Sequence, residues 1–154
     1  MVKNKGKLSQ FLKSQKLLVL ASQDKDIWVA NIFYGIADDF KFYFISNEET
    51  KHSRQIIKNS SVAFSVAWFN DADHSDRKGV QGQGKCRTAE NDEEIKKGIE
   101  LHNQNFPEFA ERITPEWIKS LKNKSRVWVI KPTYIKYWDD GLYGQDEFEE
   151  FNFK

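Results

Sequence analysis

Cysteine, proline and glycine are all scarce in this sequence, and no long hydrophobic run is present. One cysteine, Cys86, cannot form an intramolecular disulfide or a cysteine-rich zinc site, which fits a reducing compartment. Three prolines and eight glycines exclude collagen and low-complexity chains. The apolar run at residues 17–21 is shorter than a signal-peptide core or a membrane span requires. We therefore expect a soluble, cytoplasmic protein that does not enter a membrane.

Net charge is also small, because 24 Lys and Arg residues face 23 Asp and Glu residues, giving +1. This balance argues against a general polyanion binder, so we expect no nucleic-acid partner. The charge is unevenly distributed: residues 1–16 hold five lysines and no acid, whereas residues 139–154 hold six acids and one lysine. Charge runs usually decorate surfaces. The simplest interpretation is two solvated ends that can lie near each other.

Aromatic residues, by contrast, are plentiful, with five Trp, five Tyr and twelve Phe among the 154 residues. Each ring can bury about 150 to 250 Å², which is far more than a disordered chain offers. A chain of this length is typical of one hydrophobic core. No repeat or composition break divides it, so we expect residues 1–154 to form a single domain.

Hydrophobic periodicity predicts a mostly antiparallel sheet with short helices. β-Branched and aromatic runs between polar turns mark strands, and helical spacing with capping residues marks helices. The expected strands are residues 17–21, 27–37, 41–46, 62–69, 79–89, 127–130 and 133–138, and the expected helices lie near 8–15, 51–57, 91–107 and after 114. The first three strands form an antiparallel meander, and Pro132 marks an edge or a bulge. About six strands with inserted helices predict an α+β domain built on a closed or nearly closed barrel.

The junction at residues 42–52 is the most informative one chemically. A strand ends at Ser46, and a helix begins after the hydroxyl of Thr50 with Lys51 and His52 in its first turn, followed by Arg54. Free backbone N–H groups and the positive end of the helix dipole favour an anion at such a start. The pattern is suited to a phosphate. An ordinary capped helix with exposed basic side chains explains the same spacing.

Two further segments are candidates for contact with a ligand. The strand at residues 28–35 is apolar except for Asn31, and it either packs in the core or offers backbone groups to a flat ligand. Residues 79–84 carry three glycines, but neither the Walker spacing nor a following helix is present, so they do not form a phosphate loop. A bent strand that directs Gln81 into a site is consistent with these glycines.

Other chemistry-bearing residues give weaker signals. The cluster Asp71, Asp73, His74 and Asp76 matches no calcium-loop spacing and is interpreted as a solvated turn, so no metal site is expected. His102 lacks the zinc-protease pattern and is given a surface or capping role. No Ser-His-Asp order is present, and Cys86 is interpreted as a buried small side chain.

Taken together, these segments resemble a known family, the pyridoxamine 5′-phosphate oxidase-like split-barrel flavoproteins, and within it the small YhbP-like proteins. The likeness rests on Ser-Asn-x-x-Thr-Lys-His-x-x-Gln-Ile from residue 46, on Gly-Val-Gln-x-x-Gly from residue 79, and on residues 27–34, 103–107 and 127–130. It extends from about residue 8 to residue 142. The resemblance implies an α+β fold that is mainly an antiparallel six-stranded split β-barrel with short flanking helices. It also implies a homodimer with two FMN sites at the subunit interface.

Carried over by position, the resemblance implies a set of cofactor-binding residues: Asn31, Ile32, Phe33, Tyr34, Ile45, Ser46, Thr50, Lys51, His52 and Gln81. Residues 31–34 would run along the isoalloxazine ring, and Gln81 would approach it. Residues 45 and 46 would flank the ribityl chain and the phosphate. Residues 50–52 would hold the phosphate, in agreement with the anion site expected at the helix start.

The sequence also departs from the oxidases proper. They carry a basic residue at each end of the flavin strand, where this chain has Ala30 and Gly35. Neutralisation of the phosphate would therefore fall mainly on Lys51, assisted by His52 or Arg54. The substrate-binding arginines of the oxidases have no counterpart in the acidic segment 145–153. Oxidation of pyridoxamine phosphate is not expected, because its phosphate would meet carboxylates.

The leading hypothesis is an FMN-binding, flavin-dependent oxidoreductase with a small-molecule substrate of unknown identity. The flavin would carry the hydride or electron chemistry, and no side chain is singled out as a catalytic acid or base. A second hypothesis keeps the barrel and the dimer as a non-catalytic module that binds flavin, haem or another planar ligand. A third is a barrel without a ligand that acts only through its dimer surface, suggested by Ala30 and Gly35.

Overall fold

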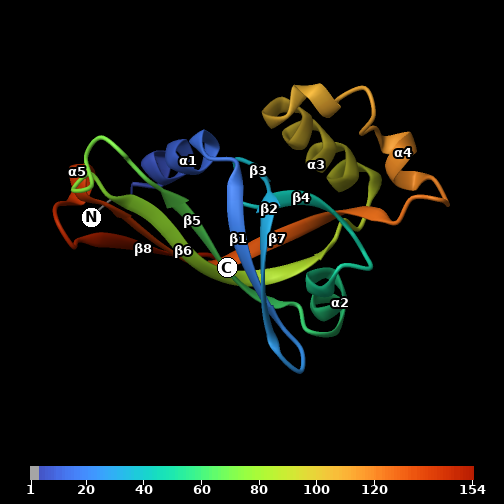
Figure 1. Ribbon diagram of the computed structural model, residues 1–154, viewed down its shortest axis with the longest axis horizontal. Coiled ribbons are helices and arrows are strands. Elements are labelled where there is room, and N and C mark those ends of the chain that lie inside the picture. Colours follow the sequence, from blue (N-terminus) through green and yellow to red (C-terminus); the bar gives the residue numbers. More distant parts are fainter. Residues whose placement is uncertain (1–3) are drawn as a thin grey trace.

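The computed structural model describes residues 4–154, in which one curled antiparallel sheet is flanked by short helices (Figure 1). Lys3 of the basic head lies outside these residues. The strands are β1 (Leu17–Gln23), β2 (Ile27–Phe33), β3 (Gly35–Ile36), β4 (Phe42–Asn47), β5 (Ser61–Trp68), β6 (Lys78–Thr88), β7 (Ser125–Asp139) and β8 (Phe148–Asn152). The helices are α1 (Lys5–Ser14), α2 (Lys51–Lys58), α3 (Asp92–Asn105), η1 (Pro107–Phe109), α4 (Pro115–Lys119) and α5 (Asp140–Tyr143).

The strand order makes the sheet a barrel with one split. The order is β2-β1-β5-β6-β7-β4-β3, and every pairing is antiparallel. Its two outermost strands, β2 and β3, are consecutive in the chain and separated only by Tyr34. The sheet therefore curls until its ends meet, leaving an opening between β2 and β4. The α+β split-barrel prediction is confirmed, and so is the meander, because residues 27–36 pair with β1 and then with β4.

The strand count differs from the expected six, since this sheet has eight strands. The expected strand at residues 27–37 breaks into β2 and β3, whereas the two expected strands at residues 127–138 are one long strand, β7. Pro132 lies where the register with β6 shifts, opposite Gly84, which confirms the predicted bulge. The eighth strand, β8, lies in the acidic tail and was not expected, because charged residues are poor strand formers.

The main core fills the barrel with side chains from alternate strand positions. In β5, Val62, Phe64 and Val66 point inward and are buried, and the residues between them are more exposed. Leu18 and Leu20 of β1 have no exposed surface. Burying one such side chain contributes roughly 1.5 to 3 kcal/mol, so this alternation fixes which face of each strand is inside.

Helix α1 closes one end of the barrel and joins the two charged ends of the chain. Leu8 and Leu12 of α1 are fully buried in the core. The backbone N–H of its capping residue, Asn4, donates to the Glu149 carboxylate at 3.2 Å, and the Lys5 ammonium lies 5.4 Å from the Phe153 ring centre. The expectation that the basic head and the acidic tail lie near each other is confirmed for these residues.

A second, smaller core lies between α3 and the outside of β4 and β7. Ile99 of α3 packs there with Tyr43 of β4 and Val127 and Val129 of β7. Among residues 4–154, no helix combines the length and apolar character needed to cross a bilayer. The assignment of residues 1–154 to a single domain stays a prediction.

Candidate functional site

The start of α2 has the hydrogen-bonding groups expected of an anion site. Thr50 is extended, and its hydroxyl oxygen accepts from the Ser53 N–H at 3.4 Å, so it caps the helix as predicted. Its carbonyl oxygen accepts the first intrahelical bond, from Arg54 at 3.0 Å. The N–H groups of Lys51 and His52 have no partner among residues 4–154. Two donors therefore remain free at the positive end of the helix dipole.

Side chains from β4 and α2 converge beside this helix start. The His52 Nε2 atom lies 2.8 Å from the Ser46 hydroxyl and 3.2 Å from the Thr50 hydroxyl. The indole N–H of Trp128 donates to the Ser46 carbonyl at 3.0 Å and fixes the end of β4. His52 is 9% exposed, and burial lowers its pKa below the ordinary value. The site therefore offers the Ser46 hydroxyl and an imidazole that is neutral near pH 7, whereas the Thr50 hydroxyl donates to the Asn47 carbonyl at 2.9 Å.

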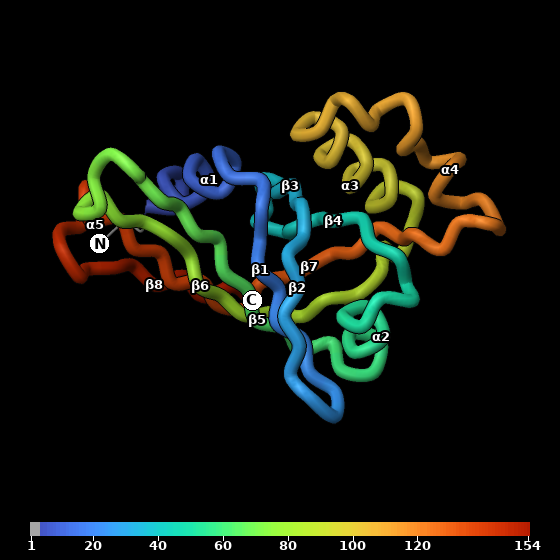
Figure 2. Tube along the Cα trace, in the orientation of Figure 1, coloured from blue at the N-terminus to red at the C-terminus, as the bar shows by residue number. Residues whose placement is uncertain are grey.

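Lys51 forms an ion pair within the chain, and its role beside a phosphate stays a prediction. Its ammonium lies 2.6 Å from a carboxylate oxygen of Asp26 and 4.4 Å from the ring centre of Trp28. The hydrogen bond from Lys51 lowers the pKa of Asp26. Lys51 thus ties α2 to the β1–β2 hairpin, which Figure 2 shows extending beside the helix. Arg54, one turn along the helix, forms no hydrogen bond or close ion pair through its side chain among residues 4–154, although its charge helps to lower the pKa of Glu49.

Gln55 also belongs to the site, although the sequence analysis did not predict it as a site residue. It is 5% exposed, accepts from the Ser22 hydroxyl at 2.6 Å, and donates to the Asp26 carboxylate at 2.8 Å. These bonds fix the orientation of α2 against β1. The available signal was its spacing, since Gln55 lies four residues after Lys51 and so on the same side of the helix.

The split of the barrel brings three of the predicted segments around one opening. Strand β2 pairs only with β1, so its other edge is unpaired, and it contacts both β4 and α2. Asn31 and Phe33 of β2 are exposed on the outside of the barrel, whereas Ile32 points into the core. Ile45, near the end of β4, is half-buried against the second core. The β2 edge, the end of β4 and the start of α2 are thus neighbours.

Tyr34, the last residue of the predicted flavin strand, is held in the core. Its side chain is 1% exposed, and its hydroxyl donates to the Leu12 carbonyl at 2.7 Å. Its N–H donates to the Lys16 carbonyl at 3.1 Å, and its carbonyl accepts from Asn105 at 2.9 Å. Every polar group of Tyr34 has a partner within the chain. Its position therefore stabilises the bend between β2 and β3.

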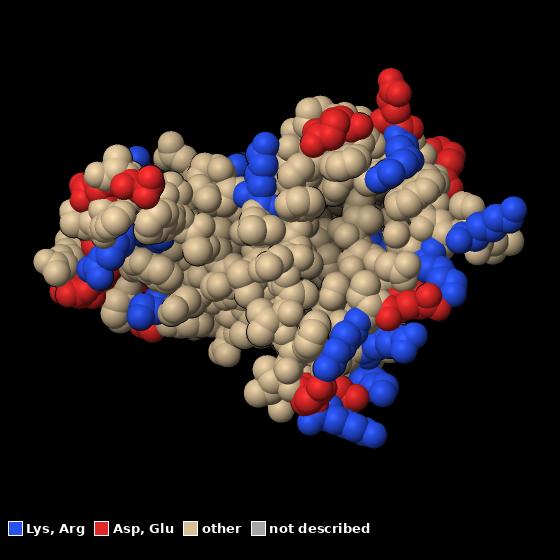
Figure 3. Space-filling model, in the orientation of Figure 1, with Lys and Arg blue, Asp and Glu red and all other residues tan. Residues whose placement is uncertain are grey.

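Gln81 shares the outer face of the sheet with Asn31 but lies farther along it. Register partners form one row across five strands, consisting of Asn31, Val19, Ser65, Gln81 and Lys136. Three strand spacings separate Asn31 from Gln81, or about 14 Å. Figure 3 shows that this face carries few charged side chains over β1 and β2, and that they gather at its rim.

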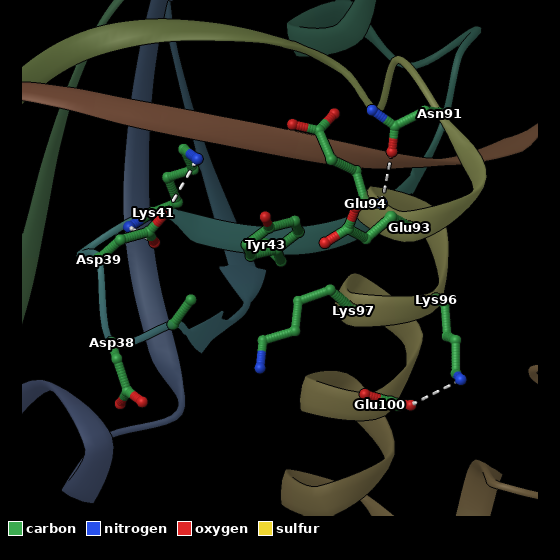
Figure 4. Close-up of a pocket in the computed structure, with 11 residues that line it drawn as sticks. Asp38, Asp39, Lys41, Tyr43, Asn91, Glu93, Glu94, Lys96, Lys97 and Glu100 are labelled. Atoms are coloured by element: carbon green, nitrogen blue, oxygen red, sulfur yellow. Dashed lines mark hydrogen bonds and ion pairs between the residues drawn. The ribbon is translucent and has the colours of Figure 1, made fainter.

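A large cavity lies elsewhere, between the β3–β4 turn and α3, and has a volume of ≈ 640 Å³. Figure 4 shows Tyr43 at its centre, with Lys41 and Asp39 on one side and Glu94 and Lys97 on the other. Most of its charged groups are already paired. The Lys41 ammonium lies 2.9 Å from Asp39, and Glu94 receives hydrogen bonds from an arginine of β6. This cavity was not expected from the sequence.

The weaker sequence signals have structural explanations. Cys86 is buried, and burial raises the pKa of its thiol to about 12, so it is not a nucleophile. Asp73 accepts from the Ser75 N–H at 3.0 Å in an exposed turn, and the described residues contain no group of three metal-ligating side chains. The surface role expected of His102 was wrong, whereas its place in the last turn of α3, where its carbonyl accepts from the Phe106 N–H at 2.9 Å, agrees with the capping alternative. The ring is 8% exposed because Phe106 and Phe109 cover it where the chain turns back after α3.

Comparisons with known proteins agree with this fold. A family model described as pyridoxamine 5′-phosphate oxidase matches residues 5–139. A UPF0306 protein of Campylobacter jejuni is 30% identical over 138 residues, which cover 88% of this chain and 90% of that protein. The UPF0306 protein YhbP of Escherichia coli is 28% identical over 137 residues, covering 88% of this chain and 84% of YhbP.

A solved structure extends the fold comparison. A haem-binding protein of Mycobacterium smegmatis superposes with a TM-score of 0.74 at 13% sequence identity. The match covers 99% of this chain and 60% of that chain. At this identity the likeness concerns the fold alone.

Proposed function

Because the chain belongs to the pyridoxamine 5′-phosphate oxidase family and is YhbP-like within it, we propose that it binds FMN and acts as a flavin-dependent oxidoreductase on a small molecule. The observation that carries the proposal is the convergence of Ser46, Thr50 and His52 beside two free N–H groups. Hydroxyl, imidazole and backbone N–H groups are suitable partners for a phosphate. The arrangement also borders the open edge of β2, along which a flat ring would lie.

The donor set fits the phosphate group of FMN. The N–H groups of Lys51 and His52 would bind phosphate oxygens, and Ser46 would donate its hydroxyl hydrogen. Thr50 would have to exchange its hydrogen bond to the Asn47 carbonyl for one to the phosphate. Arg54 would supply the charge, since Lys51 is engaged by Asp26. The bound flavin would accept and return a hydride or electrons, while the protein would orient it and limit its contact with water. No described side chain is assigned as a general acid or base.

We further propose that the outer face of β1 and β2 is a homodimer interface that completes two cofactor sites. Leu17, Val29 and Phe33 on this face are 49%, 55% and 53% exposed. Contiguous exposed apolar residues are typical of association surfaces. A ring on β2 would then be covered by the second subunit, which would exclude water from it.

The substrate is not expected to be pyridoxamine phosphate. Arg77, the arginine nearest the acidic tail, is held by Asp140 at 2.8 Å and Asp146 at 2.9 Å. A phosphate bound by Arg77 would have to displace both carboxylates, at a cost in electrostatic energy.

The test is a titration of the purified protein with FMN and, in parallel, with riboflavin, which lacks the phosphate. We expect the fluorescence of FMN to be quenched when it binds. Riboflavin should bind at least about tenfold more weakly, because it lacks the phosphate and so loses one or more charge-assisted hydrogen bonds. No flavin absorbance after purification together with no FMN titration signal would contradict the proposal. Reduction of bound FMN by NADH or NADPH, with turnover on an acceptor, distinguishes an enzyme from a flavin carrier.

A second candidate is a non-catalytic module for haem or another planar ligand. The similar fold of the haem-binding protein from Mycobacterium smegmatis favours it. The outer face of the sheet would accept a porphyrin as readily as a flavin. Titration with haemin under the same conditions separates the candidates, since a Soret band that shifts on binding, with no FMN signal, would favour the haem module.

A further inference from the structure

A small cavity of ≈ 280 Å³ lies where β6, β7, α5 and β8 meet, outside the proposed phosphate site. Its volume is just below the range of about 300 to 1,000 Å³ that is typical of pockets for drug-sized ligands. It therefore suits a compound of one or two rings. Gln81 lines this cavity and also lies in the row of outward-facing residues that begins at Asn31. The cavity is thus the far end of the face on which the flavin ring is proposed to lie.

Two aromatic side chains form the apolar wall of the cavity. Trp138 and Phe148 are register partners on neighbouring strands and face the same side of the sheet. The indole of Trp138 lies over Gly79, where an added Cβ would come within 2.5 Å of the ring. Glycine at this position therefore allows the indole to lie flat against β6. Phe148 remains 46% exposed, so it presents open aromatic surface to a ligand.

The polar groups of the cavity are unequally satisfied. The guanidinium of Arg77 is held by Asp140 and Asp146. Lys136, in contrast, has no ion pair among residues 4–154, and its ammonium lies 4.2 Å from the Phe148 ring centre. The side chain of Gln81 also has no hydrogen-bond partner among these residues. An ammonium group and an amide are therefore available beside an aromatic wall.

Glu150 is the register partner of Lys136. Its Oε1 atom accepts from the Tyr134 hydroxyl at 2.6 Å, and no close ion pair joins it to Lys136. Cation–π contact with Phe148 keeps the Lys136 ammonium on the cavity side. The one cation in the cavity without a carboxylate partner thus lies beside its exposed aromatic surface.

We propose that this cavity binds a planar aromatic anion, with its ring against Trp138 and Phe148 and its acidic group on Lys136 and Gln81. The cavity is separate from the proposed flavin ring, because four strand spacings, or about 19 Å along the sheet, lie between Asn31 and Lys136. Its binding does not depend on the proposed function, since every group that carries the argument belongs to this chain.

The experiment compares naphthalene-2-carboxylate with naphthalene-2-carboxamide, which has the same ring and no charge. Binding is followed by NMR through the assigned indole N–H signals, with and without FMN. We expect the carboxylate to shift the Trp138 signal and to bind about tenfold more tightly than the amide, since it adds a charge-assisted hydrogen bond. Lys136→Gln should remove this preference, and Phe148→Ala should weaken both probes.

Lys131→Gln is the matched control, because Lys131 is an exposed lysine of the same strand outside this cavity. It should leave both affinities unchanged. Equal affinities for the two probes, a preference that survives Lys136→Gln, or shifts that spare Trp138 would overturn the proposal. An FMN titration without a signal would remove the proposed function but leave the naphthalene result intact, so the two failures are distinguishable.

Discussion

The start of α2 and the large cavity beside α3 are both rich in charged residues, but they differ in how many polar groups are satisfied. The cavity is the larger, and its Lys41 and Glu94 are engaged within the chain. Among residues 4–154, the start of α2 keeps two N–H groups without a partner, and Arg54 forms no close ion pair. A ligand gains hydrogen bonds only from groups that the protein has not already used. Unsatisfied donors therefore indicate a binding site better than cavity volume does.

Of the variants that test this comparison, Arg54→Ala is expected to have the largest effect, which is on FMN affinity. If Arg54 is the cation that neutralises the cofactor phosphate, its removal should weaken FMN binding by about 1.5 to 3 kcal/mol, as for a hydrogen bond to a charged group. Affinity for riboflavin should not change. Fluorescence titration measures both. Lys58→Ala is the control, because Lys58 lies in the last turn of the same helix and pairs with Asp24.

The variant Lys51→Ala compares the contribution of Lys51 to FMN binding with that of Arg54. Because Lys51 is bound by Asp26, its loss should weaken FMN binding less than the loss of Arg54. A larger effect at Lys51 would mean that Lys51 leaves Asp26 to bind the phosphate, as the sequence alone predicted. In that case Asp26→Asn should strengthen FMN binding.

The next largest effect is on the free energy of unfolding, and it is expected from a variant at the large cavity beside α3. Arg87 donates two hydrogen bonds of 2.8 Å to Glu94, and these bonds lower the pKa of Glu94 from 4.5 to about 2. Arg87→Ala should destabilise the protein by about 2 kcal/mol at pH 7, allowing for partial solvent exposure of the arginine. FMN affinity should not change. Urea denaturation measures the first quantity and flavin titration the second.

The pH dependence of this pair has a definite sign. The pKa of Glu94 is lower in the folded than in the unfolded state, so its contribution is full above pH 4.5 and is lost as the pH falls toward 2. The stability difference between wild type and Arg87→Ala should therefore be constant from pH 5 to 7 and shrink below that range. A difference that persists unchanged at pH 3 would show that the arginine acts through packing.

Strand composition predicted a closed or nearly closed antiparallel barrel, and the family resemblance implied the split. In the structure, alternate residues of β1 and β5 are buried. The sequence also located the helix start, since Thr50 is a strong N-cap residue. It could not show the direction of the Lys51 side chain, which depends on Asp26, a residue 25 positions earlier. The cavity beside α3 was missed for the same reason. Its walls come from segments about 50 residues apart, and no local pattern joins them.

A pair of variants with smaller expected effects on stability distinguishes helix capping from cofactor binding at Thr50. Thr50 caps α2, and Thr114 caps α4 by accepting from the Trp117 N–H at 3.1 Å. Thr50→Ala and Thr114→Ala should each lower the free energy of unfolding by about 1 kcal/mol. The Thr50 variant alone should also weaken FMN binding, because its hydroxyl faces His52. If both variants leave FMN affinity unchanged, Thr50 is a capping residue and nothing more.

The smallest effect is expected at the rim of the large cavity. Lys13 and Asp38 form an ion pair of 2.6 Å, but their side chains are 49% and 92% exposed. Solvent and salt screen such a pair, and ordering two mobile side chains offsets most of the attraction that remains. Asp38→Asn should therefore leave the thermal unfolding midpoint and FMN affinity within experimental error of wild type. A measurable loss of FMN binding would mean that the cavity beside α3 takes part in cofactor binding. It would then be wrong to infer the site from unsatisfied donors rather than from volume.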